Sequence, residues 1–225
     1  MLDKLFSSTR SDSVVVIGLG RFGASVAESL IDMGHEVLGL DEDASLVQNW
    51  SDRLTHVAQT DSTNIEALRQ LGVDEFIHAV VGIGSDLEAS VLTVLALQEL
   101  GVKDIWAKAM SAKHGQILER IGAHHVVYPE AAMGERVAHL VTGKMFEFIE
   151  FEDGFAIAKT GAPQEAHGKT LAESAIRTRY GVTVIGLKRP KTDFVYAKAD
   201  TQIHEGDFLI VAGTTKLVEK FSAQV

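Results

Sequence analysis

The feature that most constrains the fold of this chain is a repeated unit, in which a short apolar run is followed by an amphipathic stretch. The apolar runs cover residues 14–17, 36–40, 55–58, 76–81, 105–107 and 125–127, and helical patterns lie between them at 22–33, 45–50, 65–71, 87–100 and 113–121. Glycines at 34, 72, 101 and 122 follow four of these helical patterns, as expected at helix ends. Repeated strand–helix–strand units favour a parallel sheet covered on both faces. We therefore predict a Rossmann-like, doubly wound α/β domain over residues 1–130.

The pattern changes after residue 130. A helical stretch over 131–145 predicts a connecting helix, assigned to residues 131–146. Beyond it, apolar runs of alternating character at 148–151, 155–159, 183–187, 194–197 and 208–211 are separated by turn signals, and two short helices fit at 170–175 and 216–221. These patterns predict a second, smaller α+β domain over residues 147–225.

Composition excludes several classes of protein. The chain has no cysteine, which rules out disulfides, iron–sulfur clusters, cysteine zinc sites and a thiol nucleophile. Its net charge of −10 makes nucleic acid a poor candidate partner. No apolar run is long enough to span a bilayer, and the first residues lack the apolar stretch of a signal peptide. We expect a cytoplasmic protein.

The clearest motif is GxGxxG over residues 18–23, between the first predicted strand and helix. Gly18 makes the tight turn, Gly20 allows a pyrophosphate to approach the backbone, and Gly23 allows helix and strand to pack closely. Asp41 follows 23 residues after Gly18, where a carboxylate accepts hydrogen bonds from a ribose. The neighbouring Glu42 would repel a 2′-phosphate. We predict an adenine-nucleotide site that excludes NADP; a purely structural turn is the alternative.

Arg21 distinguishes this motif from that of a dehydrogenase, where the corresponding position is usually small or apolar. A guanidinium at the start of the helix can bind a terminal phosphate through two hydrogen bonds. This residue therefore favours ATP or ADP over NAD. The alternative is an arginine that lies along the helix surface in solvent.

Further polar residues follow the other predicted strands, at the edge where a ligand crevice is expected. Asp61 is a candidate for the adenine amino group or for a helix cap, and Lys108 for a phosphate or for solvent. Gly82 and Gly84 permit close backbone approach. Glu130 is a candidate oxygen ligand for Mg²⁺ or Ca²⁺ beside ATP, or a capping glutamate.

Motifs of catalysis are missing from the sequence. The nine histidines form no HExxH or other metal spacing, and there is no GxSxG and no Walker-type GxxxxGK[ST]. The second domain offers no acid–base pair of the kind that a dehydrogenase needs. The sequence therefore favours a binding module over an enzyme.

The segments VIGLGRFG, MGHEVLGLDED, VVGIG, WAKA, IGAHHVVYPE and MGERVA resemble the Ktr-type potassium-uptake regulators of bacteria, members of the RCK family with a TrkA-N and a TrkA-C domain. The resemblance covers nearly the whole chain and is looser after residue 145. It implies a cytosolic homo-oligomeric ring, commonly an octamer built as a tetramer of dimers, bound beneath a membrane potassium-translocating subunit. It also implies that ATP and ADP select different ring shapes and that the ATP-bound ring activates uptake.

The resemblance also assigns roles to residues of this sequence. Arg21 would contact the γ-phosphate, Asp41 the ribose, and Glu130 the divalent cation. Asp61 and Ser62 would lie by the adenine, although the TDST segment departs from the more common GDAT. The full set of candidate nucleotide contacts is Gly18, Gly20, Arg21, Phe22, Gly23, Asp41, Glu42, Asp61, Ser62, Gly82, Ile83, Gly84, Lys108, Ala109, His114 and Glu130. Some relatives bind cyclic di-AMP between two second domains, in a region matched here by Arg177 and residues 182–185.

The sequence leaves two other functions open. An NAD(H)-dependent oxidoreductase or redox-sensing repressor would share the GxGxxG motif and Asp41, but it needs a catalytic site or a DNA-binding domain. A soluble RCK partner of a different cation channel or antiporter would have the same sequence features as a potassium-uptake regulator.

Overall fold

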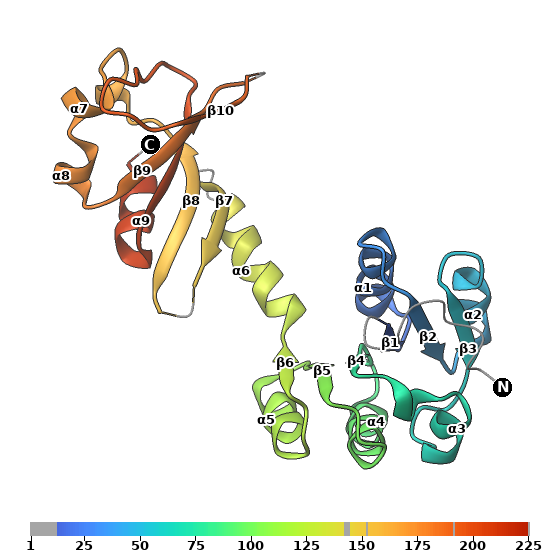
Figure 1. Cartoon of the computed structure of the whole chain (residues 1–225). Helices are drawn as coiled ribbons and strands as arrows, with labels where there is room; N and C mark the ends of the chain where they lie inside the picture. Colours follow the sequence, from blue (N-terminus) through green and yellow to red (C-terminus); the bar gives the residue numbers. More distant parts are fainter. Residues whose placement is uncertain (1–12, 142–144, 152, 191, 225) are drawn as a thin grey trace. The chain divides into compact units, whose positions relative to one another are not determined.

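The computed structural model describes residues 13–141, 145–151, 153–190 and 192–224 (Figure 1). Contacts divide the chain into two compact units, with the boundary between Glu130 and Ala131. Each unit has its own sheet and its own hydrophobic core, so each is described by itself.

The first unit is built on a six-stranded parallel sheet. Its strands are β1 (Val14–Ile17), β2 (Val37–Asp41), β3 (His56–Gln59), β4 (His78–Val81), β5 (Asp104–Lys108) and β6 (His125–Val127). Their order is β3-β2-β1-β4-β5-β6, and every neighbouring pair is parallel. This order confirms the predicted doubly wound sheet. The direction of winding reverses between β1 and β4, which is where such sheets open a ligand crevice.

Helices cover both faces of this sheet because successive strand residues point to opposite sides. The helices are α1 (Arg21–Asp32), α2 (Ala44–Trp50), α3 (Ile65–Gln70), α4 (Leu87–Glu99) and α5 (Ala112–Arg120), with a short 3-10 turn, η2 (Val73–Glu75). Val14 and Val16 of β1 pack with residues of α1 and α2, whereas Val15 and Ile17 pack with residues of α3, α4 and α5. Each of the four predicted helix-ending glycines has a positive φ, between 71° and 108°.

The second unit holds a five-stranded antiparallel sheet. The connecting helix α6 (Pro129–Val141) leads to β7 (Met145–Glu150), β8 (Phe155–Gly161), β9 (Thr183–Lys188), β10 (Phe194–Tyr196) and β11 (Phe208–Thr214), in the order β10-β9-β11-β8-β7. Short helices η3 (Gln164–Ala166), α7 (Leu171–Ser174) and α8 (Ile176–Tyr180) precede β9, and α9 (Thr215–Ser222) follows β11. The buried side chains include Leu187, Leu209, Val211 and Phe221. The smaller α+β domain is thus confirmed.

Two elements differ from the sequence prediction. Met145, expected at the end of the connecting helix, begins β7 and is 5% exposed in the second core; residues 142–144 of that expected helix lie outside the described residues. The segment after residue 170 forms two helices, because Ala175 adopts a left-handed conformation (φ 49°) between them. An alanine gives no sequence signal for such a break. Within the described residues, no helix is both long and apolar enough to cross a bilayer.

Candidate functional site

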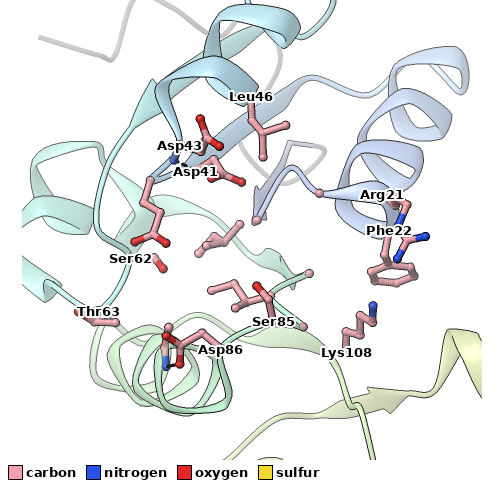
Figure 2. A pocket seen from close by; sticks show the side chains of 18 of the residues that line it. Arg21, Phe22, Asp41, Asp43, Leu46, Ser62, Thr63, Ser85, Asp86 and Lys108 are labelled. Atoms are coloured by element: carbon pink, nitrogen blue, oxygen red, sulfur yellow. Dashed lines mark hydrogen bonds between the residues drawn. The ribbon is translucent and has the colours of Figure 1, made fainter.

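A cavity of ≈ 560 Å³ lies in the first unit at the carboxyl ends of its strands (Figure 2). The last residues of β1, β2 and β5 contribute to its wall, together with residues of the loops that follow β1, β2, β3 and β4. The candidate residues that line it are Gly18, Gly20, Arg21, Phe22, Asp41, Glu42, Asp61, Ser62, Gly82, Ile83, Gly84, Lys108 and Glu130. Residues far apart in the sequence thus meet where the topology of the sheet predicts a ligand crevice.

Three candidate residues do not line the cavity. Gly23 lies behind the loop, where a Cβ would come within 1.9 Å of the carbonyl oxygen of Gly18, so its role is helix–strand packing. Ala109 is 2% exposed in the hydrophobic core. His114 on α5 is 1% exposed; its Nδ1 accepts a hydrogen bond from the N–H of Met110 (3.3 Å), and burial lowers its pKa. These three residues therefore lie outside the lining of the cavity, and their contact with a nucleotide stays a prediction.

The glycines of the loop allow two chain segments to lie close together. Gly18 has a φ of 88°, and a Cβ there would be 3.0 Å from the backbone nitrogen of Ile83. A Cβ on Gly82 would be 2.9 Å from the carbonyl oxygen of Gly18. Gly20 is different, because a Cβ there would meet nothing within 4 Å and its φ of −64° suits any residue. The missing side chain of Gly20 therefore keeps open the space in front of the first turn of α1.

Asp41 joins β2 to the glycine-rich loop. Its Oδ2 accepts a hydrogen bond from the backbone N–H of Leu19 (2.6 Å), and its Oδ1 accepts one from the N–H of Asp43 (2.9 Å). A carboxylate can accept about four hydrogen bonds in all, so Asp41 keeps capacity for a ribose. Asp43 caps α2, and hydrogen bonds from the side chain and backbone of Ser45 hold its pKa below the usual range. Asp43 therefore caps the helix, whereas Asp41 holds the glycine-rich loop and the turn before α2, and its role in binding a ribose stays a prediction.

The residues predicted near the adenine have local partners. Asp61 Oδ1 accepts hydrogen bonds from the hydroxyl (2.6 Å) and the N–H (2.9 Å) of Thr63, which lower the pKa of Asp61. The cap of α3 is Asn64, so the alternative of Asp61 as a helix cap is wrong. Ser62 is 8% exposed and shares a 2.7 Å hydrogen bond with Thr93 on α4, so its hydroxyl is already engaged.

Positive charge gathers at one end of the cavity, where Arg21, Phe22 and Lys108 lie together (Figure 2). Lys108 is 8% exposed, and its Nζ lies 2.6 Å from Oε1 of Glu130. The hydrogen bond from Lys108 is the main reason why the pKa of Glu130 is lowered, and the positive charges of Lys108 and Arg21 add to it. The described lining contains only two basic residues, against the six acidic residues Asp41, Glu42, Asp43, Asp61, Asp86 and Glu130.

Several residues of the wall were not predicted as ligand contacts. Thr60, Thr63 and Met110 lie within two residues of predicted ones, so a wider window at each strand end would have found them. Leu46 and Ala89 come from α2 and α4, and no local pattern separates them from other residues of those helices. The cap of α4 is Asp86, whose side chain accepts a hydrogen bond from the N–H of Ala89 (2.9 Å).

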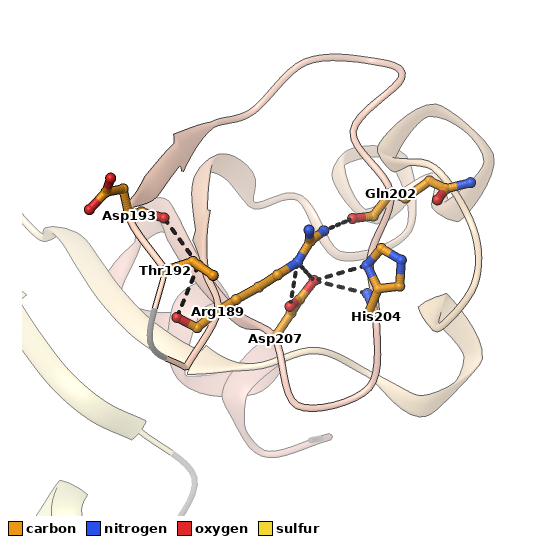
Figure 3. A network of polar contacts seen from close by, with 6 residues as sticks. All are labelled: Arg189, Thr192, Asp193, Gln202, His204 and Asp207. Atoms are coloured by element: carbon orange, nitrogen blue, oxygen red, sulfur yellow. Dashed lines mark hydrogen bonds and ion pairs between the residues drawn. The ribbon is translucent and has the colours of Figure 1, made fainter.

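The second unit holds a cavity of ≈ 440 Å³, and Arg189 of its lining forms an ion pair with Asp207 (Figure 3). Arg189 Nε donates to Asp207 Oδ1 (2.9 Å), and Arg189 Nη2 donates to the carbonyl oxygen of Gln202 (3.0 Å). Asp207, 3% exposed, also accepts from the N–H of His204 (2.9 Å). This network ties β9 to the loop before β11. Neither Arg177 nor residues 182–185 line this cavity, and a cyclic di-AMP site at those residues stays a prediction.

The fold and the site define the class of protein: it has a Rossmann-like domain with a glycine-lined crevice, followed by a small α+β domain. Residues 14–129 match the TrkA-N domain, and residues 157–225 match the TrkA-C domain. The chain is 37% identical over 211 residues to Ktr system potassium uptake protein C of Bacillus subtilis, covering 93% of this chain and 96% of that protein. It is 33% identical over 217 residues to Ktr system potassium uptake protein A of Vibrio alginolyticus, covering 96% and 99%. The chain therefore belongs to the Ktr-type branch of the RCK family, as the sequence motifs predicted.

Solved structures support the same fold. The GsuK RCK domain aligns with a TM-score of 0.67 and 19% identity over 98% of this chain, and the GsuK channel bound to NAD aligns with a TM-score of 0.54 and 24% identity over 97%. GsuK bound to ADP aligns over 61% of this chain, with a TM-score of 0.53 and 25% identity. The present chain spans 48%, 39% and 35% of those chains, respectively.

Proposed function

We propose that this chain is the cytosolic regulatory subunit of a bacterial potassium uptake system, and that it binds ATP or ADP in the cavity of its first unit. In this proposal the protein is a regulatory binding module and not an enzyme. The observation that carries the proposal is that Arg21, Lys108 and the GxGxxG loop line the same cavity. Similarity to Ktr system proteins over more than nine-tenths of their length supports the choice of potassium uptake.

The residues present fit an adenine nucleotide. The open space in front of Gly20 leaves the N–H groups at the start of α1 accessible to phosphate, as anion sites at helix N-termini require. Asp41 retains acceptor capacity for the ribose hydroxyls. Arg21 and Lys108 supply the positive charge that phosphate needs, at the same end of the cavity.

Regulation requires that two nucleotides that bind in the same cavity have different effects on the protein. ATP and ADP differ by one phosphate, so they can shift a conformational equilibrium only through contacts that the γ-phosphate makes. We assign that contact to Arg21. Reversing a two-state equilibrium from 1:99 to 99:1 takes about 5.5 kcal/mol of differential binding, which a few charge-assisted hydrogen bonds per subunit supply when summed around a ring.

A divalent cation and an oligomeric ring complete the proposal. Among the described residues, no group of three or more His, Asp or Glu side chains is placed to hold a metal ion. Mg²⁺ or Ca²⁺ at Glu130 would therefore need oxygen ligands from the nucleotide, and its binding would depend on ATP. We propose a homo-oligomeric ring, an octamer by family resemblance, that lies on the cytoplasmic face of the membrane through its potassium-translocating partner.

The second candidate is an NAD(H)-binding redox-linked regulator or oxidoreductase. The GxGxxG loop and Asp41 favour it equally, and GsuK has been solved with NAD as well as with ADP. The acidic residues beside Asp41 argue against NADP in either case.

Calorimetric titration with ATP, ADP and NADH, each with and without Mg²⁺ or Ca²⁺, separates these functions. We expect ATP and ADP to bind more tightly than NADH and the cation to strengthen ATP binding alone. Arg21→Ala should remove the difference between ATP and ADP while ADP affinity is kept, and Arg120→Ala, at the end of α5 and away from the cavity, is the matched control. Equal loss of both nucleotides in Arg21→Ala would contradict the role of Arg21, and preference for NADH would favour the second candidate.

A further inference from the structure

The ion pair of Lys108 and Glu130 connects the cavity wall to the start of a helix. Lys108 is the last residue of β5, and Glu130 is the second residue of α6, which continues past the unit boundary. Nζ and Oε1 of the pair are 2.6 Å apart. The pair therefore fixes the first turn of α6 to the sheet that holds the cavity.

The two partners differ in their freedom to move. Lys108 is 8% exposed and is confined by its surroundings: a Cβ on Gly84 would come within 3.1 Å of its Nζ, and the ring of Phe22 lies 5.8 Å from it. The side chain of Glu130 is 59% exposed. If the pair separates, Lys108 stays in the cavity wall, and the Glu130 carboxylate is free to turn into solvent or toward the cation proposed beside ATP.

An anionic ligand in the cavity has few cations to bind. Arg21 and Lys108 are the basic residues of the described lining, and Lys108 already has a carboxylate partner. An oxyanion that reaches Lys108 competes with Glu130 for the same ammonium group and also repels the Glu130 carboxylate. Occupancy of the cavity and the Lys108–Glu130 pair therefore oppose each other.

We propose that the Lys108–Glu130 ion pair is an electrostatic latch that a phosphate group in the cavity opens, so that ligand binding frees the first turn of α6 from β5. This inference rests on the proposed nucleotide binding and adds the route by which that binding reaches α6. Once free, Glu130 remains in the first turn of a helix, where a negative charge is favourable. Opening the latch therefore loosens the position of α6 without melting the helix.

The test removes the carboxylate and keeps its shape. Glu130→Gln should bind ADP, in EDTA without any divalent cation, roughly two- to fivefold more tightly than the unaltered protein, the range expected when a competing half-exposed ion pair is lost. Amide hydrogen exchange over residues 130–137 should already be faster in Glu130→Gln without ligand, and should reach the rate that ADP produces in the unaltered protein. Lys108→Gln should show the same faster exchange, together with weaker ADP binding.

Two control variants separate the latch from a general effect of charge. Glu42→Gln removes one negative charge from the cavity wall without touching Lys108, so it should leave the exchange of residues 130–137 unchanged. Glu135→Gln lies on α6, away from the cavity, and should leave both measurements unchanged.

The outcomes distinguish a failure of the proposed nucleotide binding from a failure of the latch alone. If the unaltered protein binds neither ADP nor ATP, the proposed function fails. If it binds ADP but Glu130→Gln shows unchanged or weaker affinity and unchanged exchange over 130–137, the latch is overturned and nucleotide binding stands. Faster exchange in Glu42→Gln equal to that in Glu130→Gln would also overturn the latch.

Discussion

The carboxylate of Asp41 accepts a 2.6 Å hydrogen bond from the backbone N–H of Leu19, in the middle of the glycine-rich loop. The residue expected to hold a ribose thus also fixes the loop expected to hold the phosphates. A second backbone N–H, that of Asp43, binds the other carboxylate oxygen. The positions of β2, the loop and the start of α2 are therefore coupled through one side chain.

Replacing Asp41 should cost both stability and binding. Asp41→Ala leaves the two N–H groups without their acceptor, and we expect the free energy of unfolding to fall by about 1–3 kcal/mol. Asp41→Asn keeps one acceptor oxygen, so it should lose about half of that stability. Urea unfolding and ADP calorimetry on both variants measure the two effects. Full stability in Asp41→Ala would show that the loop is held by other contacts.

Replacing Gly20 by alanine should impair nucleotide binding, whereas replacing Gly23 by alanine should impair stability. In Gly23→Ala the new Cβ would lie 1.9 Å from the carbonyl oxygen of Gly18, so α1 must move away from β1, and we expect a loss of about 3 kcal/mol in unfolding free energy. In Gly20→Ala the Cβ meets nothing within 4 Å, and the loss should be below about 1 kcal/mol. Its Cβ would instead project where phosphate must approach, so Gly20→Ala should fold and lose nucleotide affinity.

Thermal unfolding and ADP titration of both glycine variants provide the measurement. Gly23→Ala, where it still folds, should unfold at a lower temperature than the unaltered protein. A stable Gly23→Ala, or a Gly20→Ala that binds ADP normally, would contradict the roles assigned to these two glycines.

The sheet of the first unit could be predicted because its signals are local. Each apolar run and each helix-ending glycine falls within a window of a few residues, and parallel order follows from the alternation of strand and helix. The same logic placed Asp41 and Lys108 at strand ends, and the structure places both in one cavity. Spacing in the sequence therefore predicted which strand ends meet.

Other features depend on contacts that no local pattern shows. The pairing of Lys108 with Glu130 joins residues 22 positions apart. The sequence pattern places Met145 on the apolar face of a helix, but it is the first residue of β7 and is buried in the core of the second unit. In each case tertiary contacts, and not the propensity of the segment, decide the outcome.

We expect Asp104, at the start of β5, to make a pH-dependent contribution to the stability of the first unit. Its Oδ2 lies 2.8 Å from Nδ1 of His78 and accepts a hydrogen bond from Nε1 of Trp106 (3.0 Å), and its Oδ1 lies 3.2 Å from Nε2 of His125. Burial alone would raise the pKa of Asp104, but these hydrogen bonds and the two histidine charges outweigh it and lower the pKa. A lowered pKa gives stability that is present above the ordinary value of 3.8 and is lost as the pH falls through the lower, folded value.

We expect Asp104→Asn to be less stable than the unaltered protein by about 1 kcal/mol at pH 5. The difference should shrink as the pH falls below 3.8 and through the lower, folded pKa, because the carboxylate takes up a proton first in the unfolded chain and then in the folded protein. Urea unfolding at half-unit steps from pH 6 to pH 3 measures it, with the exposed Asp74→Asn as the control. A difference that is constant over this range would show that the charge of Asp104 does not contribute.

Gly115 on α5 makes room for Tyr128, two residues before the latch residue Glu130. A Cβ on Gly115 would lie 1.8 Å from the hydroxyl oxygen of Tyr128 and 2.7 Å from its Cζ, so Gly115→Ala forces the ring to move. The ring packs against the first hydrophobic core, and we expect a loss of about 1–3 kcal/mol in unfolding free energy. Because the displaced ring shifts the chain that leads to Glu130, amide exchange at the start of α6 should also rise.

Adding Tyr128→Phe to Gly115→Ala removes the atom that clashes most and should restore part of the stability and part of the slow exchange. No recovery in the double variant would show that the crowding at Gly115 lies elsewhere than at the hydroxyl of Tyr128.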